Sequence, residues 1–133
     1  MEILDILILG SGPAALCLAS ELAKQNLNIK GISTKSPYEK WENTYGIWAS
    51  ELEEFGLASL LSHRWSKTVS YFGDGIKDKG NSPTKHYYDY GLINQEAFQN
   101  ELLKTCKGIQ WLNETAKLIK SENKISEVIC SSG

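Results

Sequence analysis

This sequence of 133 residues lacks the features that mark several classes of protein. Its formal net charge is only −2, so it has no strong excess of basic residues of the kind that nucleic-acid-binding proteins use, and we predict no nucleic-acid partner. It contains no apolar run of the ~18 residues that a transmembrane helix needs. A strand-like segment begins almost at the N-terminus, so we predict no signal or transit peptide and a cytoplasmic location.

Cysteine and histidine are also scarce. Cys17, Cys106 and Cys130 are widely spaced and form no C-x-x-C pair, which is typical of reduced thiols rather than of a disulfide framework. His63 and His86 are too far apart to be a pair of metal ligands on one helix. We therefore predict no metal site.

What the sequence does contain is a glycine-rich turn near its N-terminus, made of Gly10, Ser11, Gly12, Pro13, Ala14 and Ala15. The turn follows an apolar run over residues 3–9 and precedes a helical pattern. Gly10 allows the turn, and Gly12 lets the backbone approach a ligand without a Cβ in the way. The amides that follow open a helix, whose N-terminus favours an anion such as a pyrophosphate. We predict that these six residues bind a dinucleotide.

The surroundings of the turn predict a βαβ unit. The apolar residues at helical spacing are Ala15, Leu18, Ala19, Leu22 and Ala23. The helix should end near Asn26, and residues 28–33 should form the returning strand. The acidic residue expected there as a ribose ligand is missing, and we assign Thr34 to the cofactor. The open alternative is an ordinary βα turn that is rich in glycine.

The rest of the chain predicts a third parallel strand, at residues 109–112, and two antiparallel hairpins. One hairpin pairs residues 68–72 with residues 85–90 across a polar loop at 73–84, with His86, Tyr88 and Tyr90 on one face. The other pairs residues 115–119 with residues 125–130 at the C-terminal end. Helices are expected over residues 51–55 and from Asn94, as N-cap, to Gly108, with Phe98, Leu102 and Cys106 buried. The predicted fold class is α/β, a Rossmann-like domain with added hairpins.

Residues 41–48, W-E-N-T-Y-G-I-W, contain three large aromatic residues without helix or strand periodicity. Two interpretations are open: the loop caps the core, or it lines an apolar cavity for a ligand. Together with H-R-W-S-K-T-V-S-Y-F-G at 63–73 and Y-D-Y-G-L at 88–92, this block closely resembles the lycopene cyclases of photosynthetic organisms. The resemblance covers nearly the whole chain.

The resemblance implies an enzyme that closes the ends of linear lycopene into ionone rings without net redox change; β rings are the expected product, and ε rings are the open alternative. FAD would lie on the turn at residues 10–15, with NAD(P)H as the reductant of the flavin. By position, the residues near flavin and polyene would be Trp41, Asn43, Tyr45, Gly46 and Trp48. Gln95 stands where related flavoproteins often have arginine, so its contact to the cofactor would be neutral.

The resemblance also implies that residues 1–133 are the N-terminal part of an FAD/NAD(P)-binding domain. The rest of that domain, the substrate domain and the acidic catalytic region would lie beyond Gly133, so this stretch alone should be inactive. Peripheral contact with a photosynthetic membrane is expected in the whole protein. Two alternatives are another FAD-dependent oxidoreductase, such as a hydroxylase or a polyprenyl reductase, and a non-catalytic nucleotide-binding module.

Overall fold

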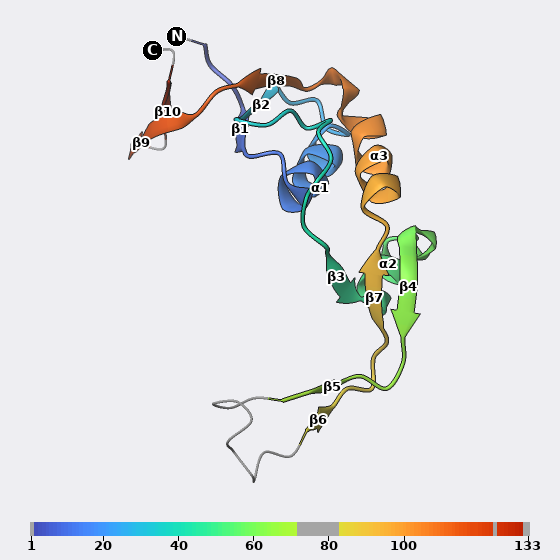
Figure 1. Ribbon diagram of the computed structural model, residues 1–133. Coiled ribbons are helices and arrows are strands. Elements are labelled where there is room, and N and C mark those ends of the chain that lie inside the picture. The colour runs from blue at the N-terminus through green and yellow to red at the C-terminus, as the bar shows by residue number, and fades with distance from the viewer. Residues whose placement is uncertain (1, 72–82, 124, 132–133) are drawn as a thin grey trace. The chain divides into compact units, whose positions relative to one another are not determined.

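The computed structural model describes residues 2–71, 83–123 and 125–131, and the chain divides into two compact units (Figure 1). Unit 1 comprises residues 1–41 and 99–133, and unit 2 comprises residues 42–98. Nearly all of the polar loop predicted at 73–84 lies outside the described residues.

Unit 1 is built on a parallel sheet of β1 (Ile6–Leu9), β2 (Ile29–Ser33) and β8 (Gln110–Asn113), in the order β1-β2-β8. The predicted third parallel strand is thus confirmed. Gly31 of β2 lies opposite Trp111 of β8, and a Cβ at Gly31 would be 2.1 Å from the Trp111 ring. The glycine therefore makes room for the indole ring to pack across the strand.

Helix α1 (Pro13–Leu22) joins β1 to β2 and buries Ala19 as predicted, with Ala15 and Leu22 packed against the core. Leu16 and Ala19 are fully buried, whereas Leu18 is 51% exposed, so its assignment to the core was wrong. Ser20 takes the neighbouring buried position, because its hydroxyl group donates a hydrogen bond to the Cys17 carbonyl and so is not left unpaired. Ser20 thus lies on the same buried face of the helix as Leu16, although hydropathy alone places a serine on the polar side.

Helix α3 (Gln95–Thr105) continues into the short 3₁₀ helix η2 (Cys106–Gly108). The predicted N-cap is confirmed, since the Ala97 amide donates to Oδ1 of Asn94 at 3.1 Å. The predicted buried stripe is also confirmed, with Phe98, Leu102 and Cys106 each under 9% exposed. In unit 1, the core around Cys106 consists of Ile8, Ala19 and Ile29.

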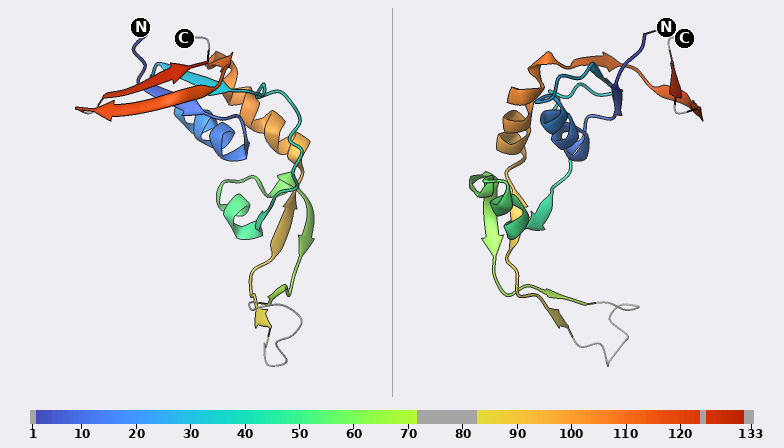
Figure 2. Two further views of the ribbon diagram at one scale, coloured as in Figure 1. Left: turned by 60° about the vertical axis from the view of Figure 1, so that its left-hand side comes forward. Right: turned by 180° about the vertical axis from the view of Figure 1, so that it is seen from behind.

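The C-terminal hairpin of unit 1 is formed by β9 (Ala116–Glu122) and β10 (Ile125–Cys130), which pair antiparallel as predicted (Figure 2). Strand β9 runs three residues further than expected. Asn123 follows it with φ of 49°, a left-handed conformation that asparagine tolerates better than most residues, and so ends the strand there.

Unit 2 contains an antiparallel sheet in the order β3-β7-β4, made of β3 (Gly46–Trp48), β7 (Tyr90–Ile93) and β4 (Leu61–Trp65). The sequence missed β3 and β4. Three residues are too few to show an alternating pattern, and four of the five β4 residues are exposed, so neither strand has a clear apolar face. Between them lie α2 (Ala49–Glu54), which begins two residues earlier than expected, and the 3₁₀ helix η1 (Ala58–Leu60).

The hairpin predicted in unit 2 exists, but its second strand is broken. β5 (Val69–Ser70) pairs antiparallel with β6 (Thr84–Lys85), and the chain then leaves this pair and enters the larger sheet at Tyr90. A continuous strand over 85–90 was therefore wrong, because the two ends of the segment pair with different partners.

Leu16 and Leu18 of α1 provide a test of this packing. Replacing Leu16, which is 0% exposed, by alanine should lower the free energy of unfolding by about 2–5 kcal/mol, because the change leaves a cavity in the core. Leu18→Ala, at a 51% exposed position on the same helix, is the matched control and should change it by less than about 1 kcal/mol. Urea unfolding followed by circular dichroism measures both, and equal losses would contradict the observed orientation of α1.

Candidate nucleotide-binding site

The glycine-rich turn lies where β1 ends and α1 begins. Gly10 has φ of +106°, a conformation that L side chains rarely adopt, and its amide donates to the Ile32 carbonyl of β2 at 2.8 Å. Gly12 is the N-cap of α1 and Pro13 opens the helix, where its missing N–H costs nothing. The Leu16 amide closes the first turn by donating to the Gly12 carbonyl at 3.0 Å. The turn thus has the strand-to-helix geometry that the sequence predicted.

The N-terminus of α1 is suited to an anion. Within α1, no side chain caps the first turn and no acidic residue lies in it, so the positive end of the helix dipole is unopposed. A Cβ placed on Gly12 would meet no atom within 4 Å. The space beside Gly12 is therefore open to a ligand. This open space and the uncapped helix end fit the pyrophosphate of a dinucleotide.

Ser11 connects the turn to the segment that follows β2. Its hydroxyl group lies 2.8 Å from the hydroxyl group of Ser33 and donates to the Lys35 carbonyl at 3.1 Å. A hydroxyl group has one proton, so Ser33 must be the donor toward Ser11. Ser33 in turn accepts a hydrogen bond from the Lys35 amide at 3.3 Å. Thr34 is exposed, and the residues on either side of it, Ser33 and Lys35, are hydrogen-bonded to Ser11 of the turn.

Two further side chains hold the segment after β2. The indole nitrogen of Trp41 donates to the Ser11 carbonyl at 3.0 Å, and the Trp41 ring is 8% exposed. The buried side-chain amide of Gln99 donates to the carbonyls of Pro37 and Glu39 at 2.8 and 2.7 Å. Trp41 is thus attached directly to the predicted phosphate-binding turn. The sequence analysis did not identify Ser33 or Gln99 as part of the site. Gln99 could have been noticed as a polar residue next to the buried stripe of α3.

The remaining predicted pocket residues belong to unit 2, where Trp48 is the centre of a group of aromatic rings. Trp48 lies opposite Tyr90, and Tyr90 lies opposite Trp65, so three rings form a row across β3, β7 and β4. The centroids of Trp48 and Tyr90 are 5.5 Å apart, and those of Tyr90 and Trp65 are 6.4 Å apart. The rings of His86 and Tyr88 also contact Trp48, at 5.1 and 6.4 Å. The predicted shared face of His86, Tyr88 and Tyr90 is confirmed.

The other residues of the motif have distinct environments in unit 2. A Cβ on Gly46 would lie 2.0 Å from the Tyr90 hydroxyl oxygen, so only glycine lets this tyrosine cross the strand. The Tyr45 carbonyl accepts a hydrogen bond from the Ile93 amide at 2.9 Å, two residues before Gln95 begins α3. Asn43 is exposed. Within unit 2, Gly46 and Trp48 are therefore brought together through Tyr90, whose contacts with these two residues the sequence did not predict.

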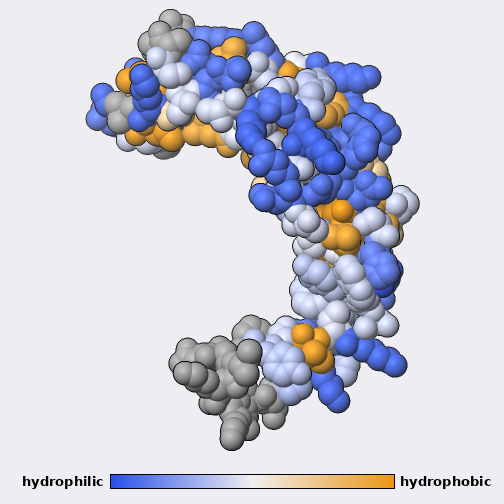
Figure 3. Space-filling view, in the orientation of Figure 1, coloured by the Kyte–Doolittle hydropathy of each residue, from blue (hydrophilic) through white to orange (hydrophobic). Residues whose placement is uncertain are grey.

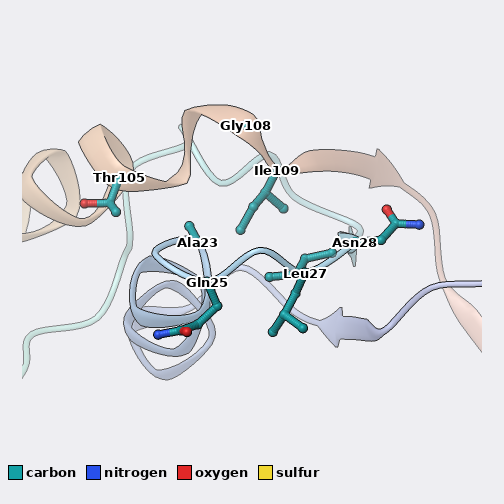
Figure 4. A pocket seen from close by; sticks show the side chains of 8 residues that line it. Ala23, Gln25, Leu27, Asn28, Thr105, Gly108 and Ile109 are labelled. Atoms are coloured by element: carbon teal, nitrogen blue, oxygen red, sulfur yellow. The ribbon is translucent and has the colours of Figure 1, made fainter.

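A pocket of ≈ 230 Å³ in unit 1 lies away from the turn (Figure 4). Its lining comes from the end of α1, the start of β2 and the chain before β8, and consists of Ala23, Gln25, Leu27, Asn28, Ile29, Thr105, Gly108 and Ile109. In open α/β sheets ligands bind beyond the carboxyl ends of the strands, where the glycine-rich turn lies. We therefore place the candidate site at the turn rather than in this pocket.

All three cysteines are free thiols, and two of them are perturbed. Burial raises the pKa of Cys106 and of Cys17, so both are poor nucleophiles near neutral pH.

In the described part of the chain, no cluster of His, Cys, Asp or Glu could hold a metal ion. No helix among the described residues is long and apolar enough to span a membrane.

The fold and the turn define the class of protein. The chain aligns with a probable FAD-dependent monooxygenase from Pseudomonas aeruginosa with a TM-score of 0.62 at 14% identity, covering 98% of this chain and 39% of that one. The chain therefore has part of the Rossmann-like α/β fold of these flavoproteins, as its sequence predicted.

The family follows from sequence comparison. Residues 5–133 match the profile described as lycopene cyclase protein, and the chain belongs to the lycopene cyclase family. It is 42% identical over 131 residues to the lycopene beta cyclase of Synechococcus elongatus, and 30% identical over 134 residues to the chloroplastic lycopene beta cyclase of Arabidopsis thaliana. The matches cover 97% and 99% of this chain but only 30% and 25% of those proteins.

The role of Gln99 can be tested without a ligand. Gln99→Met keeps the length of the side chain but leaves the carbonyls of Pro37 and Glu39 without their donor, so the free energy of unfolding should fall by about 1–3 kcal/mol. Asn100→Leu, at the exposed neighbouring position, is the control. If chemical denaturation shows the same stability for both variants, Gln99 does not hold this segment.

Proposed function

We propose that the protein to which this chain belongs is a lycopene cyclase, converting linear lycopene into a cyclic carotene with β-ionone rings. The observation that carries the proposal is the family match over residues 5–133, which includes the W-E-N-T-Y-G-I-W block. Residues 1–133 would be the N-terminal part of the FAD/NAD(P)-binding domain. The rest of that domain and the substrate domain would come from the part of the relatives that this chain does not cover.

FAD is the proposed cofactor, with its pyrophosphate at the N-terminus of α1. The open space beside Gly12 and the uncapped amides of the first turn support this placement. Thr34 and Gln95 are the proposed further contacts, and Trp41 would fix the turn through its bond to the Ser11 carbonyl. When bound and reduced by NAD(P)H, the flavin would supply negative charge beside the reacting end of the substrate.

Cyclisation of a polyene passes through a carbocation: a terminal double bond is protonated, the neighbouring alkene attacks, and loss of a proton completes the ring. Aromatic faces stabilise such a cation by about 0.5–2 kcal/mol each. We propose this role for the rings of the motif, Trp41, Tyr45 and Trp48, and we propose that Asn43 and Gly46 also lie near flavin and polyene. The acid that protonates the substrate would lie outside this chain. Because lycopene dissolves in lipid, the whole protein would contact a photosynthetic membrane from the cytoplasmic side.

Gly12→Val in the full-length protein should abolish flavin binding. Because a Cβ at Gly12 meets no protein atom within 4 Å, the fold should tolerate the larger side chain, which would instead occupy the space for the pyrophosphate. Gly108→Val is the matched control, since Gly108 also has nothing within 4 Å and lies outside the turn. The flavin absorbance of the purified proteins gives the occupancy, and thermal unfolding verifies the fold.

A folded Gly12→Val protein with wild-type flavin content would contradict the proposed site. A wild-type protein without any flavin absorbance after reconstitution would instead support the non-catalytic nucleotide-binding module. A protein that binds flavin but oxidises or reduces its substrate, rather than isomerising it, would support a hydroxylase or a polyprenyl reductase.

Trp48→Leu distinguishes the two interpretations of the aromatic motif. If Trp48 contacts the polyene, turnover should fall by about 10-fold or more, as the loss of one strong cation–π contact predicts, with a small change in melting temperature. If Trp48 only packs against Tyr90 and His86, stability should fall by a few kcal/mol while the remaining folded enzyme keeps its specific activity. Phe55→Leu, at a 73% exposed aromatic position in unit 2, is the control. Pigment chromatography and thermal unfolding are measured on the same samples.

A further inference from the structure

The β5–β6 hairpin of unit 2 presents an unusual surface to solvent. Along residues 67–71 exposed and less exposed residues alternate, as expected for a two-sided ribbon. The exposed side, which we name the outer hairpin face, consists of Lys67, Val69, Tyr71, Lys85 and Tyr87. Its apolar and aromatic members are strongly exposed: 94% for Tyr87, 70% for Tyr71 and 47% for Val69. Single exposed apolar residues are common, but three on one short ribbon indicate a contact surface.

The opposite side of the hairpin makes contacts within unit 2, although Tyr88 on that side is still 65% exposed. Nε2 of His86 lies 2.6 Å from the Ser70 hydroxyl oxygen, and the His86 amide donates to the Thr68 carbonyl at 2.9 Å. The rings of His86 and Tyr88 contact Trp48 of β3. Among the described residues, these contacts leave the outer hairpin face uncovered.

The chemistry of the outer hairpin face is both cationic and aromatic. It carries two lysines, and no Asp or Glu occurs among residues 66–71 and 83–88, although the chain as a whole has a net charge of −2. In Figure 3 apolar and weakly polar residues lie over the β5–β6 region beside strongly hydrophilic ones. Tyrosine suits the boundary between water and lipid, because its ring is apolar and its hydroxyl group polar. Lysine places its alkyl chain against apolar groups while its ammonium group reaches anions.

Lys67 of the outer hairpin face has an unusual backbone conformation. Lys67 has φ of 61°, a left-handed conformation that glycine or asparagine adopts at lower cost. The turn therefore presents a cationic side chain at a position where glycine or asparagine would adopt the backbone at lower cost.

We propose that the outer hairpin face binds the surface of an anionic lipid bilayer, with Tyr71, Tyr87 and Val69 among the headgroups and with Lys67 and Lys85 on the anionic lipids. The proposal rests on the proposed function in one respect: a cyclase of a lipid-dissolved polyene must reach the membrane. Charge complementarity selects the lipid surface over an apolar protein partner, since each lysine near an anionic surface strengthens binding about fivefold.

The test is co-sedimentation of the full-length protein with vesicles of phosphatidylcholine alone and of phosphatidylcholine mixed with phosphatidylglycerol. The wild-type protein should prefer the anionic vesicles, and this preference should weaken as salt is added. Lys67→Gln combined with Lys85→Gln should weaken binding by about 30-fold. Tyr71→Ser combined with Tyr87→Ser should weaken binding to both kinds of vesicle.

Two matched controls carry the same kinds of substitution at other positions. Lys24→Gln with Lys104→Gln removes the same charge from two exposed lysines of unit 1, and Phe55→Ser removes an exposed aromatic ring elsewhere in unit 2. Both controls should bind vesicles like the wild type. Equal losses in the lysine control, or no loss in the hairpin variants, would overturn the proposal. It would also be overturned if the hairpin variants bound vesicles normally but unfolded at a lower temperature, because the face would then be covered by the rest of the chain.

Cyclisation measured on lycopene in detergent micelles separates this proposal from the proposed function. The Lys67→Gln/Lys85→Gln protein should keep wild-type turnover in micelles and lose it on vesicles. A wild-type protein that binds anionic vesicles through this face but forms no cyclic carotene would contradict the proposed function alone. Binding of a single-stranded oligonucleotide, with the same lysine dependence and without vesicle binding, would overturn the membrane assignment.

Discussion

The hydrogen bond between the hydroxyl groups of Ser11 and Ser33 joins the glycine-rich turn to the end of β2, 22 residues further along the chain. Trp41 adds a second bond to the same residue, through the Ser11 carbonyl. Many dinucleotide-binding folds place a ribose-binding carboxylate at the end of this strand. Here a neutral serine stands there and its proton is used within the protein, so Ser33 has no proton left for a ribose, and Thr34 stays the proposed contact.

The aromatic motif is divided between the two units, and its two tryptophans do different things. Trp41 belongs to unit 1 and donates a hydrogen bond to the glycine-rich turn, whereas Trp48 belongs to unit 2 and contacts a group of rings. Gly46 is explained by the Tyr90 ring, which crosses the strand where any Cβ would collide with it. The same ring group supports the β5–β6 hairpin through His86 and so couples the motif to the outer hairpin face.

The candidate site could be predicted only where one short stretch of sequence contains it. The turn at residues 10–15 is local, and its glycines and its proline have conformational reasons that need no distant partner. Gln99 could not be predicted, because its partners, the Pro37 and Glu39 carbonyls, lie about 60 residues away in the chain. Tyr90 was predicted to share a face with its neighbours, but its role depends on the register that places it between Trp48 and Trp65.

The sequence by itself determined the parallel βαβ unit, the capped helix α3, the C-terminal hairpin and the family, because strong local patterns and a specific aromatic motif encode them. Only the tertiary structure decided that Leu16 is buried instead of Leu18, that residues 46–48 and 61–65 are strands, and that the segment 85–90 divides between two sheets. The physical reason is the same in each case. A short strand or one helix face has little preference of its own, and the partner against which it packs decides the outcome.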